Sequence, residues 1–189
     1  MSGIFSPERF IDGGKKHLVI FYEESDYARK VIYQFIKNGL VKEESCIYAT
    51  EEDPEIIERG MSEFGIDVER YKKKGLLNIF LMEPFRNFKN PLEEGKKRIQ
   101  RILSNSQPPY RVFARFVPEI NTKKGIKAEL ECEKNFHSNF DSFEGTFMCS
   151  YPIKKIEETR RHEWMHELIE NHHTVILAPS SGNGFAYDR

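Results

Sequence analysis

The chain has 189 residues, of which 39% are hydrophobic, and a formal net charge of −1 at pH 7. This length is typical of one domain, and the charge balance argues against direct binding to nucleic acid or to a membrane surface. No apolar run approaches the roughly 20 residues of a membrane-spanning helix, and the N-terminal residues lack the pattern of a secretory signal. Cys46, Cys132 and Cys149 have no metal-binding spacing and are expected to be reduced thiols. We therefore expect a cytoplasmic protein with a single domain over residues 1–189.

Short apolar runs alternate with helical patterns along the chain. The first run, at 17–22, is continuous, as expected for a strand that is buried on both faces of a sheet. Strands of this kind are expected at 17–22, 45–50, 76–82, 111–117, 146–151 and 174–178. About six strands joined by helical crossovers predict an α/β fold with three layers, in which a mostly parallel sheet has helices on both faces.

Glycine and proline mark where the predicted helices begin and end. The first helix is expected to end at Gly39, because glycine tolerates the left-handed conformation of a helix cap. Two further helices begin at Asp53-Pro54 and Asn90-Pro91, and helical segments end at Gly65 and Gly75. Helices are also expected at 126–140 and 153–171. The tail at 179–189 is expected either to be mobile or to cover an edge of the sheet.

A ligand-binding crevice is expected at the carboxyl edge of the sheet, because open α/β sheets bind ligands where neighbouring connections diverge to opposite faces. Polar and aromatic side chains near the ends of the first, fourth and fifth strands are the candidate ligand-binding residues: Tyr22, Glu23, Ser25, Arg115, Glu119 and Tyr151. The tyrosine rings would hold the apolar body of a ligand, and Arg115 with Glu119 would fix its orientation.

The turn after the first strand does not have the composition of a phosphate-binding loop. Such a loop carries glycines and ends in lysine followed by serine or threonine, whereas this chain has Tyr22-Glu23-Glu24-Ser25-Asp26. Carboxylates at this place would repel a triphosphate. We therefore expect no working P-loop and no nucleotide hydrolysis there.

Arg115 stands inside an apolar strand, where a guanidinium requires a partner because an unpaired buried charge is costly. Glu119, Glu131 and a ligand carboxylate are the candidate partners. An ion pair that only stabilises the sheet is the alternative to a role in binding. Cys149 is more typical of a small apolar core residue than of a nucleophile.

Several segments resemble, in order and spacing, the MEDS family, a sensory domain named from methanogen and methylotroph proteins and from the DcmR regulator. The matching positions are 17–23, 35–40, 46–48, 65–68, Tyr71, 75–77, Arg115 with Glu119, Glu131 with Asn135, 149–151 and His172. Among them, His17, Glu131, Asn135, Cys149 and His172 match the family without an assigned role. His172-His173 stands where the family more usually has His-Pro.

The resemblance implies a sheet like that of KaiC and other RecA-like ATPases, but without a working P-loop. It also implies that the first strand lies between the fourth and the fifth, and that the domain senses a small molecule or another signal. In the family this domain often accompanies DNA-binding or histidine-kinase modules.

A competing motif lies in the last predicted helix, where His162-Glu163-Trp164-Met165-His166 fits the zinc-binding pattern H-E-x-x-H. His172 even falls at the spacing of a third ligand. However, Ile169 occupies the place where such sites need a glycine to turn the chain. In a continuous helix, at about 100° per residue, His172 would lie off the face of the other two histidines. A solvated helix face without metal is therefore the favoured interpretation.

Taken together, these patterns predict a non-catalytic sensory or ligand-binding module that needs no cofactor and whose partner is a small molecule. A separate regulator or kinase and further copies of the same chain are the candidate protein partners. Two alternatives remain open: a zinc-dependent hydrolase that uses His162, Glu163 and His166, and a nucleotide-binding assembly protein of the KaiC type.

Overall fold

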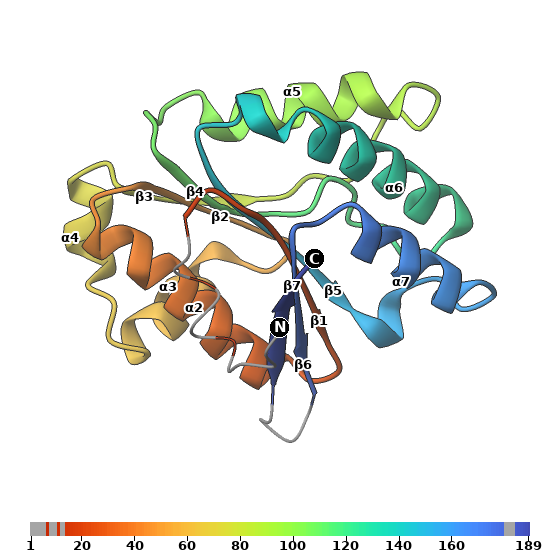
Figure 1. The fold of residues 1–189 in the computed structure, drawn as a ribbon. Coiled ribbons are helices and arrows are strands. Elements are labelled where there is room, and N and C mark those ends of the chain that lie inside the picture. Colours follow the sequence, from red (N-terminus) through yellow and green to blue (C-terminus); the bar gives the residue numbers. More distant parts are fainter. Residues whose placement is uncertain (1–6, 8–10, 12–13, 180–183) are drawn as a thin grey trace.

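The computed structural model describes residues 7, 11, 14–179 and 184–189, and these form a seven-stranded sheet with helices on both faces (Figure 1). The strands are β1 (His17–Tyr22), β2 (Ser45–Thr50), β3 (Leu77–Leu81), β4 (Tyr110–Phe113), β5 (Gly145–Pro152), β6 (Thr174–Ala178) and β7 (Phe185–Asp188). Their order is β3-β2-β4-β5-β1-β6-β7, and every neighbouring pair is parallel except β6 with β7. The mostly parallel α/β class expected from the sequence is confirmed.

Two helical layers cover the sheet (Figure 1). One layer consists of α2 (Ser25–Val41), α3 (Pro54–Glu63) and α4 (Val68–Lys73), and the other of α5 (Pro91–Leu103), α6 (Lys123–Ser138) and α7 (Arg161–Glu170). Alternate side chains of β1 enter different cores: Leu18 and Ile20 pack beneath α2, whereas Val19 and Phe21 pack beneath α6 and α7. This two-sided burial explains why the sequence of β1 is a continuous apolar run.

The helical segments end at the predicted glycines, with one exception. Gly65 and Gly75 have φ of 86° and 71°, the left-handed conformation expected at the ends of helical segments. Gly39, in contrast, lies inside α2, and the left-handed residue after that helix is Glu43 (φ 59°). Gly39 is needed for space: a Cβ there would lie 2.6 Å from Nε of Arg111, whose buried side chain crosses the helix.

Two predicted elements are shorter in the structure than in the sequence pattern. The strand expected at 111–117 ends at Phe113, because the N–H groups of Phe116 and Val117 donate to the Glu129 carboxylate instead of a neighbouring strand. The helix expected at 153–171 is a short 3₁₀ turn, η2 (Ile153–Lys155), followed by α7. The carboxylate of Glu157 interrupts it by accepting hydrogen bonds from the Thr159 N–H and hydroxyl and from the Trp164 ring.

The predicted tail and strand order also differ in part. Residues 185–188 form β7, an antiparallel edge strand on β6, so this part of the tail covers an edge and adds a strand to the expected count. Residues 180–183 of the tail, and most of the N-terminal stretch in which no signal sequence is expected, lie outside the described residues. β1 lies between β5 and β6, and not between β4 and β5 as the resemblance implied. The ends of β4, β5 and β1 are nevertheless consecutive in the sheet.

Candidate functional site

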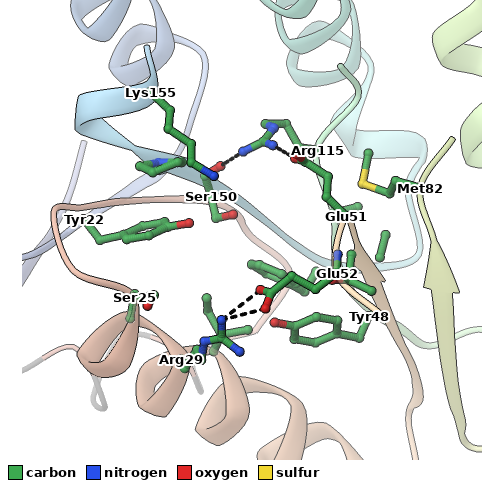
Figure 2. A pocket seen from close by; sticks show the side chains of 17 residues that line it. Tyr22, Ser25, Arg29, Tyr48, Glu51, Glu52, Met82, Arg115, Ser150 and Lys155 are labelled. Carbon is green, nitrogen blue, oxygen red and sulfur yellow. Dashed lines mark hydrogen bonds and ion pairs between the residues drawn. The ribbon is translucent and has the colours of Figure 1, made fainter. Parts of the chain in front are cut away.

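A crevice opens at the carboxyl ends of β1, β2, β4 and β5 (Figure 2). The chain leaves β1 towards α2 on one face, and it leaves the adjacent β5 towards α7 on the other face. The same divergence occurs between the neighbours β2 and β4, which continue into α3 and α6. Because the connections separate at these points, the strand ends between them stay uncovered, which is the usual location of ligand sites in open α/β sheets.

The cavity in this crevice has a volume of about 120 Å³. For comparison, an engineered apolar cavity of about 150 Å³ is large enough for benzene. The walls combine charged side chains with apolar and aromatic ones, including Met82 and Phe113. The space therefore suits a small molecule with both polar and apolar parts.

Arg115 is the most buried charged group in the crevice, at 9% exposure. Its Nε donates to the Val117 carbonyl at 3.2 Å, and its Nη1 donates to the Ser150 carbonyl at 2.9 Å. Its Nη2 donates to the carboxylate of Glu51, which is 44% exposed (Figure 2). Arg115 thus ties the ends of β4 and β5 to the turn that follows β2.

The other charged side chains leave the crevice with a positive excess. Arg29 of α2 donates from Nη2 to both carboxylate oxygens of Glu52 at 2.9 Å. Lys155 of η2 points towards the same space but forms no ion pair with any residue in the described ranges (Figure 2). With Arg115 and Glu51, the described residues of the lining include three cations and two anions. Lys155, which is exposed to solvent, is the cation among them that has no carboxylate partner within the described ranges.

Two tyrosines contribute neutral hydroxyl groups to the lining. Burial raises the pKa of Tyr22 above its usual value, and burial raises the pKa of Tyr48 further still. Both phenols therefore stay protonated at physiological pH and can donate a hydrogen bond. Their rings also supply flat apolar surface next to the charged groups.

The structure brings together three of the six residues that the sequence nominated for the crevice: Tyr22, Ser25 and Arg115 line it. The other three do not. Glu23 is exposed in the short turn before α2. Glu119 does not pair with Arg115, since its Oε1 accepts from the Phe85 N–H at 3.1 Å. Tyr151 is fully buried beneath α6, because side chains alternate along β5 and its neighbour Ser150 is the residue that faces the crevice.

Tyr151 belongs instead to a buried carboxylate network. Its hydroxyl oxygen lies 2.6 Å from Oε1 of Glu129 and 2.5 Å from Oε1 of Glu133. A hydroxyl has one hydrogen to donate, so the second contact requires a proton on one of the two carboxyl groups. Burial, and then the nearby Glu133, raise the pKa of Glu129 to about 8, in agreement with a pair that keeps a proton at neutral pH.

Sequence reasoning missed several lining residues, and the strand-end rule could have found some of them. Glu51 and Glu52 directly follow β2, so the strand-end rule applies to them as it does to the residues after β1 and β4. Arg29 lies four residues after Ser25 and hence on the same face of α2. Lys155 had no signal, because the sequence pattern placed it inside a long polar helix.

The family model of MEDS, the "MEthanogen/methylotroph, DcmR Sensory domain", matches residues 16–173. The chain belongs to the MEDS family. This membership makes it a sensory module in the broad sense that the family description gives. A search of curated proteins finds no match.

The fold of this MEDS domain is also found among solved structures. A KaiC-like protein from the hyperthermophilic archaeon Pyrococcus horikoshii superposes with a TM-score of 0.60 and 18% sequence identity. The match covers 88% of this chain and 72% of that protein. At this identity the likeness shows a shared fold, and it confirms the KaiC-like sheet that the resemblance implied.

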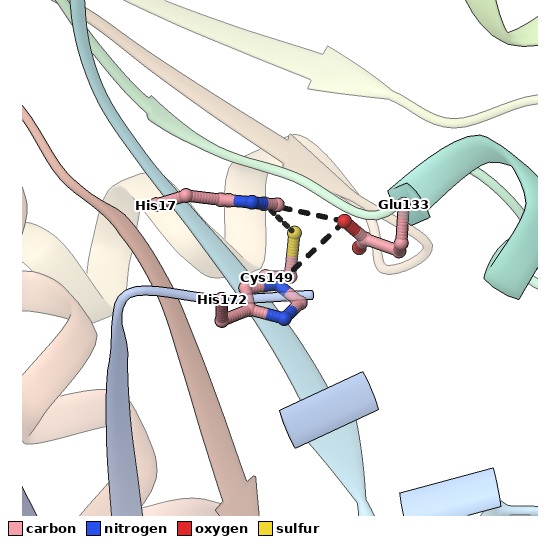
Figure 3. Close-up of side chains that lie close together, drawn as sticks. All are labelled: His17, Glu133, Cys149 and His172. Atoms are coloured by element: carbon pink, nitrogen blue, oxygen red, sulfur yellow. Dashed lines mark hydrogen bonds and ion pairs between the residues drawn. The ribbon is translucent and has the colours of Figure 1, made fainter. Parts of the chain in front are cut away.

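The five family-matching positions that have no assigned role separate into two groups in the structure. His17, Cys149 and His172 are buried and lie close together, with Glu133 of α6 completing the group (Figure 3). Glu131 is exposed and Asn135 is half-buried on α6, away from this group. Glu131 therefore does not serve as a partner of Arg115.

The H-E-x-x-H motif of the MEDS domain lies on α7, with both His162 and His166 exposed to solvent. Glu163, the residue that would act as general base, pairs with Arg160. His172 is not on this helix face, since it lies after α7 and is buried. No helix in the described part of the chain is long and apolar enough to span a membrane.

Proposed function

We propose that this MEDS domain is a non-catalytic sensor that binds a small organic anion, such as a short carboxylate, in the crevice at the carboxyl edge of the sheet. The observation that carries the proposal is Lys155. Its ammonium group faces a cavity of about 120 Å³ without a carboxylate partner among the described residues, while Arg115 and Arg29 are each paired. An anion would supply the missing partner.

The rest of the lining supports a ligand with an apolar part. Tyr22 and Tyr48 offer aromatic surface and neutral hydroxyl groups, and Met82 adds a flexible apolar contact. A carboxylate at Lys155 would leave the remainder of a short chain against these side chains. A few polar groups that fix orientation within a partly apolar cavity are typical of small-molecule sites.

The position of the crevice supports a sensing role, because its walls come from segments on both faces of the sheet. Ser25 and Arg29 belong to α2 on one face, whereas Lys155 belongs to the connection that leads to α7 on the other. A ligand held between them would draw these segments together. A separate output protein, for example a regulator or kinase, or a second copy of the chain, would respond by binding one of the two conformations more tightly.

The test compares ligands and variants in the same assay. Acetate, propionate and benzoate, together with their neutral amides and Mg·ATP, are titrated by calorimetry, and their effect on the melting temperature is measured. We expect at least one carboxylate to bind and stabilise the wild type, and its amide to bind less tightly. Lys155→Ala should lower the affinity for that carboxylate about tenfold or more, since a hydrogen bond to a charged group is lost.

Lys154→Ala is the matched control, because Lys154 is exposed in the same turn but does not line the cavity. It should leave the affinity unchanged. Equal weakening by both variants, or amides that bind as tightly as carboxylates, would contradict the proposal. Stabilisation by Mg·ATP that depends on Lys155 would favour the nucleotide-binding alternative instead.

A further inference from the structure

A second group of chemically reactive side chains lies away from the crevice, between the sheet and the layer of α6 and α7 (Figure 3). His17 is the first residue of β1, Cys149 lies in β5, Glu133 is on α6, and His172 lies in the turn between α7 and β6. His17, Glu133 and Cys149 are 0% exposed and His172 is 1% exposed. Four separate segments of the chain therefore place two imidazoles, a thiol and a carboxylate in one water-excluded place.

Three distances among these four side chains are close to the spacing of ligands around a shared metal ion. Each side chain offers one candidate ligand atom, and these atoms all lie within 4.8 Å of one another. Nε2 of His17 lies 3.4 Å from Sγ of Cys149 and 3.2 Å from Oε2 of Glu133, and Nε2 of His172 lies 3.6 Å from the same oxygen. Tetrahedral zinc, with bonds of about 2.0–2.3 Å, has ligands about 3.3–3.8 Å apart.

Three side-chain atoms in the group have no hydrogen bond in the described structure: Nδ1 of His17, Oε2 of Glu133 and Nε2 of His172. Oε2 of Glu133 and Nε2 of His172 are both buried without a partner that meets hydrogen-bond geometry, although they face each other. Buried polar atoms are almost always satisfied, so a pair of orphaned acceptors aimed at one point requires an explanation. A cation between them satisfies both.

The surrounding contacts orient the group as the neighbours of metal ligands usually do. Nδ1 of His172 lies 2.6 Å from the Leu168 carbonyl, so this nitrogen carries the proton and Nε2 presents its lone pair to the group. The other oxygen of Glu133 contacts the Tyr151 hydroxyl at 2.5 Å. Partners of this kind fix the tautomer of a ligating histidine and the orientation of a ligating carboxylate.

The protonation of the free side chains agrees with this arrangement. Burial lowers the pKa of His172 to about 3, and burial also lowers the pKa of His17 well below its usual value, so both imidazoles are neutral as metal ligands must be. Burial and Glu133 raise the pKa of the Cys149 thiol, which therefore keeps its proton while no cation is present.

We propose that His17, Glu133, Cys149 and His172 bind one Zn²⁺ ion in a closed tetrahedral site. On binding, the Cys149 thiol releases its proton to solvent as the bond between zinc and sulfur forms, and the two imidazole nitrogens and one carboxylate oxygen complete the coordination. With four protein ligands and no exposed face, the site is structural and not catalytic. It fastens α6 and the turn before β6 to strands β1 and β5, independently of any ligand in the crevice.

The test is metal loading of the full chain. The protein is stripped with a chelator, reloaded with Zn²⁺ or Co²⁺, and analysed for bound metal and melting temperature. We expect one metal per chain, a higher melting temperature with Zn²⁺, and for Co²⁺ the visible absorption of a tetrahedral site with a thiolate charge-transfer band. Cys149→Ser and His172→Gln should lose the metal.

The matched control is the double variant His162→Gln/His166→Gln, which removes the exposed histidine pair of α7 and should keep the metal. Loss of the metal in this control, or its retention in both Cys149→Ser and His172→Gln, would overturn the proposal. If those two variants fail to fold, the Co²⁺ spectrum of the wild type decides alone. A spectrum without a thiolate band, or a wild type that binds no metal, would then overturn it.

Discussion

Replacing Arg115 by alanine tests whether this residue stabilises the fold more than a charged residue in an exposed ion pair does. Its guanidinium serves two backbone carbonyls, those of Val117 and Ser150, and the carboxylate of Glu51. Leaving a buried acceptor unpaired costs about 1–3 kcal/mol. Glu51 is 44% exposed, so water hydrates its carboxylate and its loss of a partner adds little. With two such carbonyls, we expect the free energy of unfolding to fall by about 2–6 kcal/mol.

Arg29→Ala is the comparison within the same crevice. The pair that Arg29 forms with Glu52 is much more open, with side-chain exposures of 29% and 47%, and should contribute at most about 1 kcal/mol. Both variants are measured by urea denaturation, followed by circular dichroism and by the fluorescence of the single tryptophan, Trp164, which is buried on α7. Equal losses in the two variants would refute the assignment of Arg115 as the residue that joins β4, β5 and the turn after β2.

Two further substitutions test the packing of the core. Gly39→Ala should lower the free energy of unfolding by about 1–3 kcal/mol, because the added methyl group would collide with the buried Arg111 side chain; unchanged or increased stability in urea would contradict this. Tyr151→Phe should cost about 1–3 kcal/mol, because Glu129 and Glu133 lose the hydroxyl that lies between them. A melting temperature equal to that of the wild type would show that this hydroxyl does not stabilise the fold.

The sheet could be predicted from the sequence because each buried strand is a short apolar run between helical patterns. The predictions failed where a single side chain decides the backbone. Glu129 captures two N–H groups and ends β4, and Glu157 interrupts the long helix expected after β5. Such contacts join positions far apart or depend on local geometry, and hydrophobic periodicity does not report them.

The crevice was predictable only in part, for a similar reason. The strand-end rule finds the right edge of the sheet, but a one-residue step along a strand exchanges the two faces. Ser150 therefore lines the crevice while Tyr151 lies beneath α6. The family resemblance singled out His17, Cys149 and His172 without a role, but their grouping with Glu133 could not be predicted, because the four residues have no common spacing and only the fold brings them together.

The most direct test of the proposed function is a crystal structure of the protein with the carboxylate that stabilises it most. We expect electron density for the ligand in the crevice, with its carboxylate within hydrogen-bonding distance of Nζ of Lys155 and its apolar part against Tyr22. A ligand bound at another place at saturating concentration, with the crevice left to solvent, would contradict it.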